Sequence, residues 1–70
     1  MNYIFVSSSN VRAIAYDSAN SLLQVAFHSG SVYQYYGVPE NLYVSFLNAS
    51  SKGSFLHRYI KGRYSYKQVA

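Results

Sequence analysis

The stretch Ser29-Gly30-Ser31-Val32-Tyr33-Gln34-Tyr35-Tyr36-Gly37-Val38-Pro39 decides the fold that this sequence predicts. Gly30 can adopt the positive φ that a tight hairpin turn requires, so the tyrosine-rich run after it is expected to fold back on a preceding strand. Pro39 suits the first turn of a helix, where its missing N–H is not needed. The stretch therefore predicts a strand with a Tyr-X-Tyr centre, Tyr33 and Tyr35, that leads into a helix.

Upstream of this stretch the pattern indicates two further strands, which gives a small antiparallel meander of about three strands between residues 10 and 36. Residues 11–16 are rich in small and β-branched side chains, and the polar residues 17–20 are typical of a turn. Residues 22–27 alternate, so Leu23, Val25 and Phe27 are expected to share one face of the sheet.

The length of the hairpin loop determines which face the two tyrosines occupy. A two-residue loop at Ser29-Gly30 would turn Tyr33 and Tyr35 away from Val25 and Phe27. A three-residue loop over residues 28–30 would place them on the same face as Val25 and Phe27. We favour the longer loop, because a glycine in its third position fits a type I turn with a G1 bulge. It predicts that the tyrosine pair is largely core.

Two short helices are predicted after the sheet, both packed on one face of it. The first begins at residue 39, and its apolar stripe consists of Leu42, Tyr43, Phe46 and Leu47. Ser50 or Ser51 can cap the second helix, which ends at Lys61-Gly62. Its apolar stripe consists of Phe55, Leu56, Tyr59 and Ile60. Residues 63–70 are expected to form a short, basic, extended tail.

Length and composition indicate one α+β domain over residues 1–70. A chain this short buries only about 60% of the surface that it exposes when unfolded, so we expect a homo-oligomer to add stability. Cysteine is absent, and the two histidines and two carboxylates are scattered, which predicts no disulfide, metal or cofactor. The apolar residues 1–6 are too few for a transmembrane helix and lack the basic flank of a signal peptide, so we expect a cytoplasmic protein without membrane contact.

Five of the six cations fall after residue 51 and are mixed with aromatic residues, a combination that can hold phosphates by charge and bases by stacking. The candidate nucleic-acid or nucleotide contacts are Lys52, Arg58, Lys61, Arg63, Tyr64 and Lys67. A solvated helix face with its tyrosines in the core is the alternative interpretation.

The start of the second helix is a candidate anion-binding site, because small residues, a cation and free N–H groups come together there. Its residues are Ser50, Ser51, Lys52, Gly53 and Ser54. The alternative is a serine cap followed by a glycine that allows close helix packing. No catalytic residue is predicted, because Asp17 and Glu40 are unpaired, and Ser54 with His57 lacks a third group to orient the histidine.

Several pieces of the chain, in their order and spacing, resemble the KTSC domain family. They are residues 6–10, 15–17, 23–27, the Tyr33-Gln34-Tyr35 centre, and residues 38–39, 49–53 and 60–64. The family occurs at the C-terminus of some lysyl-tRNA synthetases and as single-domain bacterial and phage proteins. The resemblance implies a small antiparallel sheet packed by helices, and a role in RNA binding. The chain departs from the family pattern at His57, where the family carries a polar, Asn-like residue.

Three functions are open at this point. The first is a non-enzymatic module that binds RNA or a phosphate-bearing nucleotide through the basic second helix and tail. The second is an oligomeric sponge of the phage type that sequesters a small nucleotide immune signal. The third is a protein-interaction adaptor that uses exposed tyrosines.

Overall fold

The computed structural model describes residues 1–70, which form five strands and two helical segments. The strands are β1 (Tyr3–Phe5), β2 (Val11–Asp17), β3 (Leu22–Phe27), β4 (Val32–Tyr36) and β5 (Tyr66–Gln68). Between β4 and β5 lie α1 (Glu40–Asn48), α2 (Lys52–Phe55) and η1 (Leu56–Ile60), a π-helical turn that continues α2. The predicted α+β class is confirmed.

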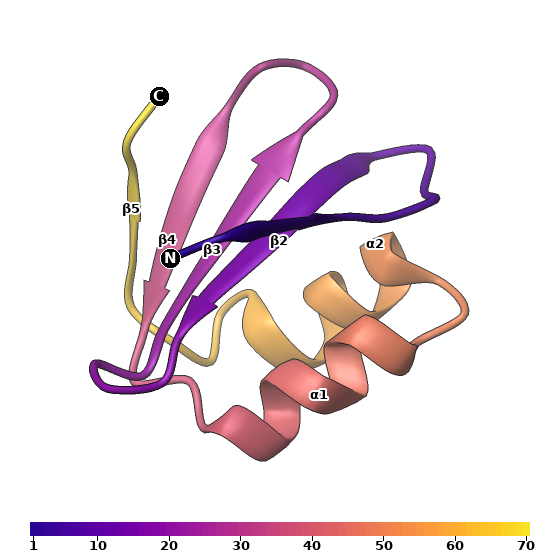
Figure 1. The fold of residues 1–70 in the computed structure, drawn as a ribbon. Helices are drawn as coiled ribbons and strands as arrows, with labels where there is room; N and C mark the ends of the chain where they lie inside the picture. The colour runs from indigo at the N-terminus through magenta and orange to yellow at the C-terminus, as the bar shows by residue number, and fades with distance from the viewer.

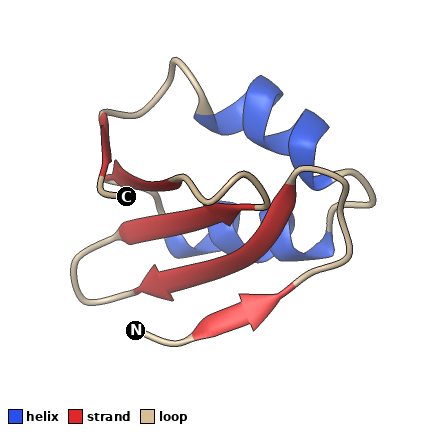
Figure 2. Cartoon of the chain, turned by 90° about the horizontal axis from the view of Figure 1, so that it is seen from above, coloured by secondary structure: helices blue, strands red, loops and turns tan.

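All five strands form one antiparallel sheet in the order β1-β2-β3-β4-β5. The prediction of about three strands was too low, because both edge strands are three residues long and all their side chains are exposed. The expected extended tail instead pairs with β4. Figure 1 shows both helical segments on one side of the sheet and β5 beside β4, and Figure 2 shows β1 along the opposite edge. We call the face turned toward the helices the inner face.

The β3–β4 hairpin has the three-residue loop that the sequence favours. The loop spans residues 28–30, and Gly30 has a φ of 99°. Val25 lies opposite Tyr33, so the side chains of Tyr33 and Tyr35 are on the inner face. Tyr35 is only 1% exposed, as predicted for a core residue, whereas Tyr33 is only partly buried.

A β-bulge near the start of β2 turns its first residue toward the core. The register against β3 shifts between Val11 and Ala13, which leaves Arg12 as the extra, exposed residue. Val11 and Ile14 therefore both face inward, and both are fully buried. Without the bulge the side-chain alternation of a strand would place them on opposite faces.

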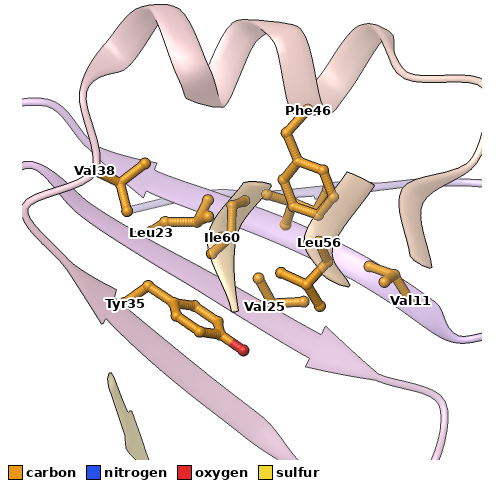
Figure 3. Packing of buried hydrophobic residues seen from close by; sticks show 9 residues of the cluster. Val11, Leu23, Val25, Tyr35, Val38, Phe46, Leu56 and Ile60 are labelled. Atoms are coloured by element: carbon orange, nitrogen blue, oxygen red, sulfur yellow. The ribbon is translucent and has the colours of Figure 1, made fainter. Parts of the chain in front are cut away.

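The core lies between the inner face and the helices, as Figure 3 shows. Its buried members are Val11, Ile14, Leu23, Val25, Tyr35, Val38, Phe46, Leu56 and Ile60. Phe46 points from α1 toward the side chains of the second helical segment (Figure 3). The rest of the predicted stripe of α1 is partly buried against this cluster: Leu42, Tyr43 and Leu47.

The second helix begins as predicted but continues as a π turn. Ser51 caps it, since its hydroxyl oxygen accepts a hydrogen bond of 3.3 Å from the amide of Ser54. In η1 the amide of Lys61 donates to the carbonyl of Leu56, five residues earlier, at 2.8 Å. Leu56 and Ile60 are buried as predicted. Of the other two residues of the predicted stripe, Phe55 is partly buried, but Tyr59 is exposed, so its place in the stripe was wrong.

Candidate functional site

A cleft of about 590 Å³ opens between the loop that joins β1 to β2 and the start of the second helical segment. We call it the serine cleft, because six serines and no hydrophobic or acidic side chain line it. The lining residues are Ser7, Ser8, Ser9, Asn10, Ser50, Ser51, Lys52, Gly53, Ser54, His57 and Arg58. The structure therefore brings the whole predicted anion-binding segment, residues 50–54, together with residues 7–10, which were not predicted as site residues.

Side-chain hydrogen bonds fix both walls of the serine cleft. The hydroxyl oxygen of Ser8 accepts hydrogen bonds from the amides of Asn10 (3.3 Å) and Val11 (3.2 Å), which orders the loop as a serine turn. On the opposite wall, the hydroxyl oxygen of Ser51 accepts from the amide of Ser54. In each case the hydroxyl proton stays free to donate. The cleft therefore presents hydrogen-bond donors to a ligand.

The two walls of the serine cleft approach each other at Gly53. A β-carbon added there would lie 3.1 Å from Nδ2 of Asn10, which is tighter than ordinary van der Waals contact. The absence of a side chain at Gly53 thus lets α2 lie close to the loop before β2. The alternative interpretation of Gly53 as a close-packing glycine holds, but its neighbour is a loop and not a helix.

Two cations, Lys52 and Arg58, give the serine cleft its positive charge, and His57 lies beside them. The ammonium of Lys52 donates to the carbonyl oxygen of Ala49, which anchors the side chain and leaves further N–H donors for a ligand. His57 and Arg58 are exposed, and the side chain of neither makes a hydrogen bond or ion pair within the protein. These two side chains are therefore free to meet an anion.

A second cavity, of about 480 Å³, lies on the inner face where the hairpin, β5 and the end of η1 meet. We call it the tyrosine pocket. It is lined by Phe27, Ser29, Ser31, Tyr33, Tyr35, Lys61, Gly62 and Tyr66. The ring centroid of Tyr66 lies 5.7 Å from that of Tyr33 and 5.9 Å from that of Tyr35. The predicted Tyr33–Tyr35 motif thus forms one wall of a three-tyrosine cluster.

The hydroxyl of Tyr35 has no hydrogen-bond partner in the protein, although the side chain is buried. By contrast, the hydroxyl of Tyr16, also on the inner face, donates to the carbonyl of Val38 at 2.5 Å. The oxygen of Tyr35 points away from Val38 (Figure 3). Burial, with smaller effects of Tyr33 and Tyr66, raises the pKa of Tyr35 to about 12. The phenol therefore remains a hydrogen-bond donor at neutral pH.

The remaining predicted contact residues do not form one continuous surface. Lys61 lines the tyrosine pocket, whereas Arg58 lines the serine cleft. Arg63 is turned back, because its Nε donates to the carbonyl of Arg58 at 3.1 Å. Tyr64 packs against the core. Lys67 pairs with β4 in a register that places its side chain on the face away from the helices.

The two carboxylates lie outside both cavities. Asp17 belongs to the β2–β3 turn, where the side-chain amide of Asn20 donates to it at 2.8 Å and lowers its pKa. Glu40 lies in the first turn of α1. No group of three or more metal-ligating side chains comes together, and no helix is long and apolar enough to cross a bilayer. Ser54 and His57 both line the serine cleft, without a third group bonded to the histidine.

The lining residues that the sequence analysis did not predict as binding residues are residues 7–10 and His57 in the serine cleft, and Phe27, Ser29, Ser31, Gly62 and Tyr66 in the tyrosine pocket. A polar run directly between two apolar segments was the available signal for residues 7–10. No sequence signal pointed to Tyr66, because its ring joins those of Tyr33 and Tyr35 only when β5 pairs with β4.

A family model described as the KTSC domain matches residues 7–64. The chain belongs to the KTSC domain family. Both walls of the serine cleft and the whole tyrosine-bearing hairpin of this KTSC domain lie inside the matched region, while β5 lies beyond it.

The same domain occurs within large and small proteins. This KTSC domain is 39% identical over 60 residues to a lysine–tRNA ligase of Trichormus variabilis, a match that covers 86% of the chain but only 11% of the ligase. A protein of Tsukamurella paurometabola is 37% identical over 59 residues, which are 84% of this chain and 88% of that protein. A crystal structure of a KTSC domain protein from Yersinia pestis is 38% identical, with a TM-score of 0.95, and the match covers 99% of this chain and 97% of that one.

Proposed function

We propose that this KTSC domain is a non-catalytic module that binds a phosphate-bearing ligand, a nucleotide or RNA, at the serine cleft. The lining of the cleft carries the proposal, because it combines serine hydroxyls with two cations and contains no carboxylate. A phosphate offers negative charge and acceptor oxygens only. Hydrogen bonds from cationic side chains to such oxygens are about twice as strong as neutral ones.

Other classes of ligand fit the serine cleft poorly. A metal ion or a cationic peptide would meet Lys52 and Arg58 without a counter-charge. An apolar ligand would cover the serine hydroxyls without giving them hydrogen-bond acceptors, which costs free energy. Catalysis is not part of the proposal, since Asp17 and Glu40 lie outside the cleft and His57 has no partner that would orient it.

Two lines of support point to different forms of the ligand. Similarity to a segment of lysine–tRNA ligases favours RNA. The finite size of the cleft, and the separation of Lys61 and Lys67 from it, favour a discrete nucleotide over a long polymer. An oligomeric protein that sequesters a small nucleotide would use the same cleft. Its affinity would be independent of polymer length, and native mass spectrometry would show its subunit number together with any retained nucleotide.

Fluorescence anisotropy titrations test the proposal with a labelled single-stranded RNA and a labelled dinucleotide, each at two salt concentrations. Arg58→Gln should weaken binding about tenfold and flatten the salt dependence by about one released ion. Arg12→Gln is the matched control, because it removes the same charge from an exposed residue outside both cavities. The proposal fails if neither probe binds at low salt, or if the two variants weaken binding equally.

A steric variant tests the same cleft without a change of charge. Gly53→Val should weaken binding, because the added side chain must occupy the space beside Nδ2 of Asn10. Valine is tolerated in helices at a modest cost, so the fold should persist and its thermal melt should stay cooperative.

A further inference from the structure

The tyrosine pocket is separate from the serine cleft, and its lining has a different chemistry. Four aromatic rings form its walls, with one cation and small hydroxyl-bearing residues at its rim. No residue belongs to the linings of both cavities. The pocket therefore needs an explanation of its own.

The rings are held in place before any ligand arrives. The ring of Tyr33 meets Phe27 edge to face, with centroids 5.7 Å apart and an interplanar angle of 89°, and meets Tyr66 at 5.7 Å on another side. A preorganised aromatic surface loses little conformational freedom when a ligand stacks on it. Any planar aromatic ligand can stack on such a surface, because its ring has a π face.

Two polar groups in the tyrosine pocket have no partner in the protein. The hydroxyl of Tyr35 makes no hydrogen bond within the protein, and since no fully buried side-chain oxygen lacks a partner, this hydroxyl opens onto the pocket although the side chain as a whole is 1% exposed. Lys61 makes no ion pair and is exposed at the rim of the pocket. The hydroxyl can donate to a heteroatom of a ring inside, while the ammonium can meet a negative charge at the mouth.

We infer that the tyrosine pocket binds a nucleoside monophosphate, with the base against the rings of Tyr33 and Tyr66 and the phosphate at Lys61. A volume of about 480 Å³ lies within the range of small-molecule sites. The base would supply the acceptor that the Tyr35 hydroxyl lacks. This is a second site, and it does not depend on the function proposed for the serine cleft.

Calorimetric titration with adenosine 5′-monophosphate, adenosine and ribose 5-phosphate tests whether both the ring and the charge are needed. The monophosphate should bind at least about tenfold more tightly than either fragment, since each fragment lacks one of the two recognised groups. Amide chemical shifts should change at Ser29, Ser31 and Gly62 when the monophosphate is added.

Variants assign the contacts. Tyr35→Phe should weaken binding of the monophosphate about three- to tenfold, the value of one hydrogen bond. Lys61→Gln should weaken it about tenfold and reduce its salt dependence. Lys67→Gln, which removes the same charge from the far face of the sheet, should leave it unchanged.

Equal binding of ribose 5-phosphate and the monophosphate would overturn the inference, and so would wild-type affinity in both Tyr35→Phe and Lys61→Gln. Chemical-shift changes confined to residues 8–10, together with sensitivity to Arg58→Gln, would also overturn it while supporting the function proposed for the serine cleft. Retained amide dispersion in each variant confirms that a loss of affinity is not a loss of fold.

Discussion

Replacing Tyr16 or Tyr35 by phenylalanine should change the free energy of unfolding by very different amounts, although both side chains are on the inner face. The hydroxyl of Tyr16 donates to the carbonyl of Val38 at 2.5 Å, so Tyr16→Phe leaves that carbonyl without its partner. The expected cost is about 1–3 kcal/mol of unfolding free energy. The hydroxyl of Tyr35 has no partner to lose, so Tyr35→Phe should change stability by less than about 0.5 kcal/mol.

Urea denaturation followed by circular dichroism measures both changes, provided that the slope with denaturant stays constant. Tyr35→Ala provides the scale, because loss of a fully buried ring should cost about 3–5 kcal/mol, a large share of the stability of a small domain. If Tyr35→Phe costs as much as Tyr16→Phe, the Tyr35 hydroxyl has a protein partner after all. That result would refute the argument that this hydroxyl is available to a ligand.

Three further outcomes follow from particular residues. Because burial raises the pKa of Tyr35 from 10.0 to about 12, the folded state holds this proton more tightly than the unfolded state, so its contribution is complete below pH 10 and is lost as the pH rises toward 12. Urea midpoints of the wild type should therefore fall more steeply than those of Tyr35→Phe over this alkaline range. Tyr66→Ala should return the pKa of Tyr35 toward 10.0, as followed by tyrosinate absorbance, since Tyr66 contributes to the raised value and its ring packs beside that of Tyr35. Gly30→Ala should cost about 1–2 kcal/mol in the same urea assay, because φ is 99° there, whereas Ser29→Ala in the same loop should cost much less.

The central hairpin was predictable because its signals are local. Gly30 marks the loop, and the alternation of residues 22–27 fixes which side chains face inward, so the loop length alone settled the register. Tyr35 became core as expected. Tyr33 did not, because a pocket opens beside it, and no local pattern tells a residue that lines a cavity from one that is fully packed.

The edge strands could not be predicted in the same way. The three residues of β1, and likewise those of β5, are all exposed, so neither strand shows a period of two. Their extended conformation is fixed by hydrogen bonds to β2 and β4, which are contacts between segments far apart in the sequence. The charge and brevity of residues 63–70 are equally typical of an unpaired tail.

The serine cleft was half predictable for a related reason. Residues 50–54 were identified from their own composition, but residues 7–10 lie about forty positions earlier and already have a local role as a turn. Gly53 was the sequence signal that something packs closely against the second helix, since a glycine inside a helix costs about 1 kcal/mol relative to alanine. A glycine shows that a neighbour approaches but cannot show which segment it is, and here it is Asn10.

The π turn explains why Arg58 and Lys61, two predicted contacts in the second helix, line two separate cavities. Residues three apart in an α-helix lie on the same face, so a regular helix would have placed Arg58 and Lys61 side by side. In η1 the amide of Lys61 instead bonds to the carbonyl of Leu56, and the backbone leaves the helix in an extended conformation at Lys61. Arg58 consequently lines the serine cleft and Lys61 the tyrosine pocket. A single basic face would favour a polymer of phosphates, whereas two cations in the serine cleft and one in the tyrosine pocket, separated by differently lined cavities, favour ligands recognised one group at a time.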